Sequence, residues 1–152
     1  MLYAQLLVYE SDGHLAALLR PLAEERRWLV RQPRRAESCV CLLRRGHPAV
    51  LVLRLETDVL HGLAVLEHVS RLCPDALSVV VGETPNAELC GLAWHLGAHY
   101  VLLPPEPRHR LPEVVAGLMD AALARRQTDA TPRTEPPMTT DEELPEASLE
   151  DE

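Results

Sequence analysis

Short unbroken apolar runs alternate with longer segments in which apolar residues recur every three or four positions. The clearest run, Ala-Val-Leu-Val-Leu at 49–53, is too short for a helix and rich in valine, so it predicts a strand buried on both faces. Similar runs predict four more strands, at 4–9, 29–32, 76–81 and 100–103. Helical spacing predicts five helices, at 14–28, 36–45, 62–72, 87–96 and 111–126. This alternation is typical of a doubly wound α/β fold, a five-stranded parallel sheet with helices on both faces.

The composition changes beyond Gln127, where the chain consists mainly of Thr, Pro, Glu, Asp and Ser. Such a segment buries too little apolar surface to fold. We therefore expect one folded domain over 1–126 and a disordered acidic tail over 127–152. The tail holds nine acids and one arginine, a charge of -8, which equals the net charge of the whole chain. The domain holds fourteen acids and fourteen arginines and is neutral.

A neutral domain with an acidic tail argues against nucleic-acid binding, which needs a basic surface. No apolar stretch approaches the roughly 20 residues that span a bilayer, and the first residues lack a signal-like pattern, so we expect no membrane span and a cytoplasmic protein. All fifteen basic residues are arginine, which excludes chemistry that requires a lysine amine.

Four cysteines, Cys39, Cys41, Cys73 and Cys90, occur in a chain without a secretory signal, so we expect reduced thiols. Their spacing fits neither a zinc knuckle nor a C-x-x-C redox motif. No phosphate-binding loop, dinucleotide fingerprint, nucleophile elbow or metalloprotease motif is present. The sequence thus predicts no cofactor and no metal.

Two charged residues follow strands of the predicted sheet. Arg54 ends the run at 49–53, and Glu10 ends the run at 4–9. Because the carboxyl ends of parallel strands meet at one edge of a sheet, both should lie at that edge. Two alternatives stay open: Arg54 donates a charge-assisted hydrogen bond to Glu10, or it points into solvent.

Three segments resemble the receiver domain, the phosphoacceptor module of two-component response regulators. Residues 48–62 read PAVLVLRLETDVLHG, close to the family pattern P-D-L-V-L-L-D-L-x-M-P-x-M-D-G. Residues 71–81 match the end of the third helix and the fourth strand, and 97–105 match the G-A-x-x-Y-L-x-K-P signature. The resemblance covers 4–126. Another flavodoxin-like doubly wound domain is the alternative.

The family's phosphoacceptor chemistry does not transfer to these residues. The resemblance places the phosphoacceptor aspartate at Arg54, which is always protonated and is not a nucleophile. The acidic pair that binds Mg²⁺ falls on Tyr9 and Glu10, or on Glu10 and Ser11, so one carboxylate remains. The resemblance therefore implies a degenerate domain, or pseudo-receiver, with a guanidinium in place of the metal.

Two further positions of the family's switch also differ. The switch Ser or Thr falls on Gly82, and the phosphate-sensing lysine falls on Pro104. The switch aromatic falls on Val101, or on Tyr100 if one gap is allowed. A receiver that uses another acceptor, Asp12 or Asp58, is a further alternative.

The resemblance implies a non-catalytic signalling or adaptor module that binds a protein partner without phosphorylation. Receivers signal through the face of the fourth helix, fifth strand and fifth helix, which here would carry Trp94, His95, Tyr100 and Leu102. A homodimer is one form of this partnership, and the tail is a second candidate docking element. The arginines at 34, 35, 44 and 45 could form a basic patch that binds an acidic partner or the chain's own tail. The alternative is that they only form a solvated helix end.

The alternative function is a ligand-binding or enzymatic domain that uses the strand-end crevice around Glu10 and Arg54. Glu83 and His61 are the other groups available there. They do not make a set of nucleophile, base and orienting group, so we expect no enzyme.

Overall fold

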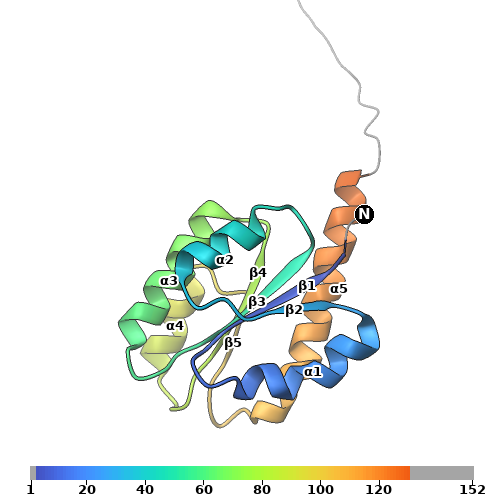
Figure 1. Cartoon of the computed structure of the whole chain (residues 1–152). Helices are drawn as coiled ribbons and strands as arrows, with labels where there is room; N and C mark the ends of the chain where they lie inside the picture. Colours follow the sequence, from blue (N-terminus) through green and yellow to red (C-terminus); the bar gives the residue numbers. More distant parts are fainter. Residues whose placement is uncertain (1–2, 131–152) are drawn as a thin grey trace, which may run out of the picture.

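The computed structural model describes residues 3–130, with side chains described as far as 126. Five parallel strands form one sheet in the order β2-β1-β3-β4-β5 (Figure 1). Their bounds are β1 Gln5–Tyr9, β2 Leu29–Arg31, β3 Ala49–Arg54, β4 Leu77–Val81 and β5 Tyr100–Leu102. This sheet confirms the predicted doubly wound α/β fold.

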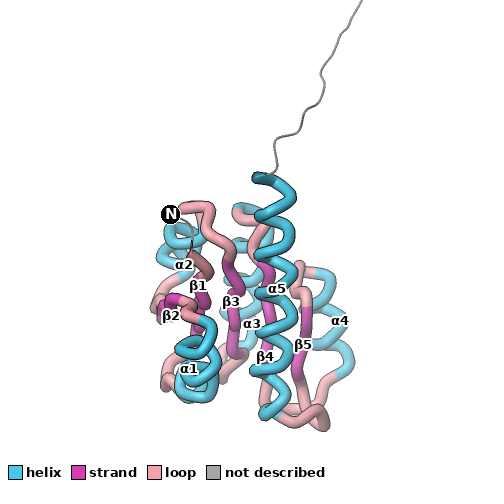
Figure 2. The backbone as a smooth tube through the Cα atoms, turned by 90° about the vertical axis from the view of Figure 1, so that its right-hand side faces the viewer, coloured by secondary structure: helices cyan, strands magenta, loops and turns pink. Residues whose placement is uncertain are grey.

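Helices cover both faces of the sheet (Figure 2). Their bounds are α1 His14–Arg26, α2 Ala36–Leu43, α3 Val59–Leu72, α4 Ala87–His95, the 3-10 helix η1 Arg108–Arg110, and α5 Leu111–Ala130. Buried residues of α1 and α5 pack on one face, and those of α2, α3 and α4 pack on the other. No helix among residues 3–130 is both long enough and apolar enough to cross a membrane.

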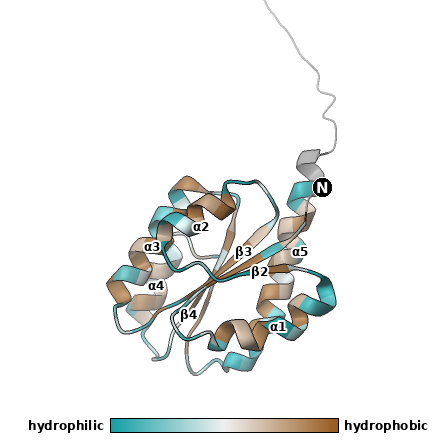
Figure 3. Ribbon diagram, in the orientation of Figure 1, coloured by the Kyte–Doolittle hydropathy of each residue, from teal (hydrophilic) through white to brown (hydrophobic). Residues whose placement is uncertain are grey.

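The central strands are apolar on both sides because each face of the sheet meets a helical layer (Figure 3). In β3, Val50 and Val52 pack with α1 and α5, while Leu51 and Leu53 pack with α2, α3 and α4; all four are 0% exposed. This two-sided burial explains why the run at 49–53 lacks polar alternation.

Two helix boundaries differ from the sequence expectation. Helix α3 begins at Val59 rather than at Gly62, because the Asp58 side chain accepts a hydrogen bond from the His61 N–H at 3.1 Å and caps the earlier turn. Helix α5 continues to Ala130, four residues into the range expected to form the tail. The rest of that range lies outside the described residues.

Candidate functional site

Three strands end together at the carboxyl edge of the sheet. Strand β3 pairs with β1 on one side and with β4 on the other, and Arg54 lies opposite Val81 in this register. The residues that follow β1 and β4, at 10–12 and 82–83, therefore flank Arg54. The edge is built by strand register, which brings together residues 29 and 42 positions apart in the chain.

Arg54 is enclosed by carboxylates. Its Nε and Nη2 donate to Glu83 Oε2 at 3.1 and 2.7 Å, and its Nη1 donates to Asp12 Oδ1 and Oδ2 at 2.6 and 2.5 Å. The side chain is only 13% exposed. The alternative in which Arg54 points into solvent is therefore wrong, because two carboxylates hold the guanidinium against the sheet edge.

Glu10 lies close to Arg54, but its main contacts are elsewhere. Its side chain is 1% exposed, and its Oε1 is 3.6 Å from Arg54 Nη1. Its two oxygens accept hydrogen bonds from the N–H groups of Leu15 at 3.0 Å and Ala16 at 2.9 Å. The expected Arg54–Glu10 hydrogen bond is thus replaced by a weaker ion pair, because Glu10 caps α1 while Asp12 and Glu83 take the guanidinium.

The first turn of α1 explains this use of Glu10. The N-cap residue is Gly13, which has no side chain and adopts a φ of 81°. Asp12 accepts from the His14 N–H at 3.0 Å, and Glu10 satisfies the next two N–H groups. Helix N-termini favour negative charge and leave these donors unpaired otherwise. The two acids therefore stabilise α1 and the arginine together.

Arg108 is a site residue that the sequence analysis missed. Its Nη2 donates to Glu83 Oε2 at 2.9 Å, so Glu83 bridges Arg54 and Arg108. Arg108 lies in η1, beyond the proline-rich segment that follows β5. In the sequence, Arg108 is recognisable only as a charged residue that follows a predicted strand. That feature does not indicate a contact with Glu83, which lies 25 positions earlier in the chain.

Gly82 and Pro104, the two other positions singled out from the sequence, also lie at this edge. Gly82 follows β4, and its N–H donates to the Leu102 carbonyl at 3.1 Å. A Cβ on Gly82 would lie 2.3 Å from Leu103 Cδ2, so the Leu103 side chain fills the space of a residue 82 side chain. Pro104 follows β5, is half-buried and precedes a cis peptide bond to Pro105. Neither residue has a side-chain hydroxyl or amine.

The charges of the site shift its pKa values. The His14 N–H, followed by the Arg54 guanidinium, lowers the pKa of Asp12 from 3.8 to about 2. Hydrogen bonds from Arg54 and Arg108 lower the pKa of Glu83. Burial by itself would lower the pKa of Arg54, but the hydrogen bonds to Glu83 and Asp12 outweigh it and raise the pKa. Asp12, Glu83 and Arg54 are therefore all ionised at neutral pH.

Asp12 should make the free energy of unfolding depend on pH in the acidic range. Since the pKa of Asp12 is lower in the folded protein, the unfolded chain binds a proton first, and its contribution is lost as the pH falls from 3.8 towards about 2. Asp12→Asn should flatten the fall of the unfolding free energy in this window, measured by urea denaturation. Glu67→Gln, an exposed site on α3, is the control. Parallel pH curves for wild type and Asp12→Asn would contradict this prediction.

The residues at this edge do not fit the divalent cation of the receiver family. Both oxygens of Glu10 already accept N–H groups, and the Arg54 guanidinium lies among Glu10, Asp12 and Glu83. A metal there would meet a fixed positive charge. Among the residues that the structure describes, no three His, Cys, Asp or Glu side chains are grouped to hold a metal ion.

Two open recesses flank Arg54, of about 390 and 450 Å³. The first includes Tyr9 and His61, whose hydroxyl and Nε2 are 2.9 Å apart. The second includes Glu83 and Thr84. The arrangement does not place a nucleophile beside a base that a third group orients, which is what an enzymatic use of the crevice would require.

The expected partner face is only partly available. Trp94 is 46% exposed, His95 is exposed, and the Trp94 ring meets the half-buried Tyr100 ring edge-on at 6.4 Å. Leu102, however, is 2% exposed and packs in the core beneath α5, so its placement on this face is wrong. Leu92, which the sequence analysis did not select, is 43% exposed on α4.

No protein-family model and no curated protein matches the sequence. Solved structures do match. The receiver domain assigned to a Luxo repressor protein of Vibrio parahaemolyticus has a TM-score of 0.69 and 18% identity, over 85% of this chain and 99% of that one. A CheY-like receiver domain protein of Methanospirillum hungatei has a TM-score of 0.64 and 16% identity, over 82% and 99%.

NtrX of Brucella abortus, in complex with ADP, matches with a TM-score of 0.64 and 21% identity. The match covers 85% of this chain but only 29% of NtrX. Identities this low establish the fold alone. Residues 3–130 therefore have the fold of a response-regulator receiver domain.

Proposed function

We propose that this chain is a cytoplasmic, non-catalytic signalling module that binds a protein partner without being switched by phosphorylation. The observation that carries the proposal is the position of Arg54. It lies at the end of β3, where the family resemblance places the phosphoacceptor aspartate, and it is held by Asp12 and Glu83. A guanidinium forms no acyl phosphate.

The surroundings of Arg54 support the same proposal. A receiver switch needs a hydroxyl and an amine that follow the phosphoryl group, and Gly82 and Pro104 supply neither. The guanidinium already provides the positive charge that a bound metal would bring. The site therefore behaves as one charge-paired arrangement, and the domain is a pseudo-receiver.

The proposal predicts that phosphoryl donors leave the protein unchanged. Adding acetyl phosphate, or beryllofluoride, together with Mg²⁺ should not shift the backbone amide NMR signals of Gly82, Glu83 and Thr84, because Arg54 stands where the family resemblance places the acceptor carboxylate. A receiver domain that carries the acceptor aspartate serves as the positive control. Saturable shifts at these amides, or at Asp12 or Asp58, would overturn the proposal and indicate another acceptor.

We propose that the partner binds the exposed side of α4. This helix buries only Ala93 fully and presents Leu92 and Trp94 to solvent, 43% and 46% exposed. Exposed tryptophans are frequent anchors of protein interfaces. Tyr100 is less available, because its hydroxyl is hydrogen-bonded to Glu106, which also pairs with Arg110.

Trp94→Ala should weaken partner binding at least about thirtyfold, because an anchor tryptophan contributes about 2 kcal/mol or more. The measurement is the amount of specific partner that the full chain retains from an extract of its own cells, quantified by mass spectrometry. Self-association is followed by sedimentation velocity. Leu60→Ala is the matched control, since Leu60 is 78% exposed on α3. Equal losses for the two variants would contradict an interface on α4.

A further inference from the structure

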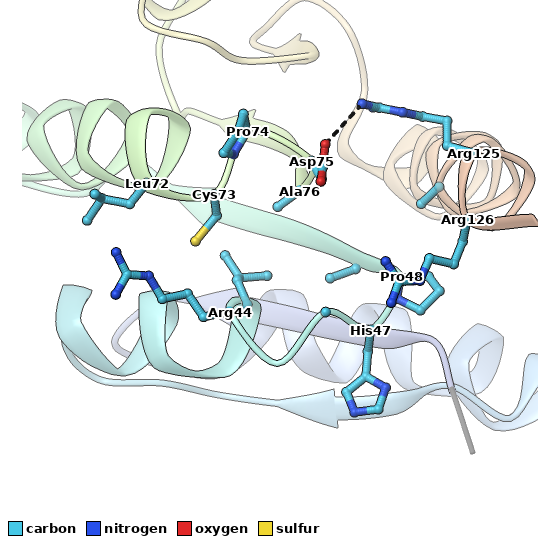
Figure 4. Close-up of a pocket in the computed structure, with 14 residues that line it drawn as sticks. Arg44, His47, Pro48, Leu72, Cys73, Pro74, Asp75, Ala76, Arg125 and Arg126 are labelled. Carbon is cyan, nitrogen blue, oxygen red and sulfur yellow. Dashed lines mark ion pairs between the residues drawn. The ribbon is translucent and has the colours of Figure 1, made fainter. Parts of the chain in front are cut away.

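A second charged recess lies at the opposite, amino edge of the sheet (Figure 4). It occupies about 270 Å³ between the loop before β3, the loop before β4 and the last turns of α5. Its walls come from residues 43–49 and 72–76 and from Ala122, Arg125 and Arg126. None of these residues belongs to the site around Arg54.

The recess is basic. Its charged lining residues are Arg44, Arg125, Arg126 and Asp75. Arg125 Nη2 lies 3.7 Å from Asp75 Oδ1, which leaves two arginines unneutralised. Among the described side chains, neither Arg44 nor Arg126 forms an ion pair. Figure 4 shows Arg44 on one side of the recess and Arg126 on the other. Arg126 Nη2 would be 3.3 Å from a Cβ on Gly46, so its guanidinium lies over the loop before β3.

Helix dipoles explain part of this charge. Arg44 follows the end of α2, where a basic side chain is favoured. Arg125 and Arg126 lie a full turn before the end of α5 at Ala130, so the dipole does not account for their place on the wall of the recess. Two guanidinium groups that form no ion pair with any side chain described up to residue 126 indicate a site for carboxylates or another anion.

The chain itself carries the complementary segment. Residues 131–152 hold eight acids and one arginine, a charge of -7. They continue from α5, whose residues Arg125 and Arg126 form a wall of the recess. The acidic run that starts at Asp141 is eleven residues beyond Ala130, and eleven residues reach at most about 40 Å. Attachment at the rim also raises the local concentration of these carboxylates.

We propose that the acidic segment 131–152 binds the amino-edge recess in cis, with the carboxylates of 141–146 against Arg44 and Arg126. Leu144, which lies within that run, would contact the apolar side of the recess near Leu72, which is 37% exposed. The recess is then occupied by the protein's own chain, and an acidic partner must displace this segment to bind there.

The first test uses amide NMR signals of the full chain. The variant Asp141→Asn, Glu142→Gln, Glu143→Gln, Glu146→Gln should shift the amides of Gly46, Asp75 and Ala76, which line the recess. It should leave Gly82 and Thr84 at the opposite edge unchanged. Raising NaCl from about 20 to about 500 mM should produce the same shifts in the wild type, because salt screens exposed charges. If neither the four substitutions nor the added salt shifts the amide signals of the recess, the proposal is overturned.

The second test removes the basic partners. Arg44→Gln combined with Arg126→Gln should reduce the salt-dependent shifts of the amides at 141–146 by roughly half or more. Arg20→Gln combined with Arg35→Gln removes the same charge from exposed sites away from the recess and should leave them unchanged. Equal reductions of the salt-dependent shifts by the two double variants would contradict the proposal. Shifts that vanish on tenfold dilution would assign the contact to a second copy and overturn binding in cis.

Discussion

Replacing Glu10 with alanine should lower the free energy of unfolding by about 2 to 3 kcal/mol. The carboxylate is 1% exposed and accepts hydrogen bonds from the Leu15 and Ala16 N–H groups. Alanine leaves both donors without their partner and removes negative charge from the start of α1. It also takes one counter-charge from Arg54. Urea denaturation followed by circular dichroism measures the loss.

Two further variants make this result specific. Glu10→Gln keeps the side-chain length and one acceptor oxygen, so it should cost less than alanine. Glu67→Ala removes an exposed glutamate from α3 and should change the stability by less than about 0.5 kcal/mol. If Glu10→Ala is as stable as Glu67→Ala, Glu10 does not cap the helix. If glutamine costs as much as alanine, the ionic contact with Arg54 dominates over the capping.

Arg54→Asp, which introduces the residue expected of the receiver family, should be more damaging than Arg54→Ala. It removes the guanidinium from a side chain that is 13% exposed and adds a carboxylate beside Glu10. Breaking such a partly buried ionic cluster costs about 3 kcal/mol, and like charges add to the cost. Thermal unfolding at low salt measures the difference between the two variants.

The response to Mg²⁺ should also distinguish the two variants. Arg54→Asp offers several carboxylates without the arginine, so Mg²⁺ at ten times its Kd should recover about 1.4 kcal/mol. Wild type and Arg54→Ala should not respond, because the first keeps its guanidinium and the second lacks the added carboxylate. A wild type stabilised by Mg²⁺ would show that Arg54 does not occupy the place of the cation. Near-wild-type stability of both variants would show that the cluster contributes nothing to folding.

Local pattern determined the elements of this protein. The run at 49–53 is apolar at every position because β3 has helices over both faces, and its valines favour extended backbone. Each strand and helix that alternation predicted is present, with ends that differ by a few residues. Where a helix begins depends on a cap: the Asp58 side chain starts α3 three residues before Gly62. The short strand β2 lies at the edge of the sheet, beside β1.

The same pattern also located the carboxyl edge as the place of Arg54 and Glu10. Strand ends are local features, and parallel pairing brings them together whatever the side chains are. The sequence therefore determined that position 54 carries a guanidinium and not a carboxylate, since that follows from residue identity alone. It could not determine which acids pair with the arginine.

Only the tertiary structure decided those pairings. Glu10 and Asp12 are two positions apart, yet Glu10 mainly accepts from the Leu15 and Ala16 N–H groups of α1, whereas Asp12 accepts from both the His14 N–H and Arg54. Glu83 and Arg108 join the site through strand register and the fold of η1. Leu102 does not lie on the expected partner face, because its side of β5 packs under α5. Hydrophobic periodicity is a property of neighbours in the chain, whereas charge pairing depends on distances of a few ångströms between segments far apart in it.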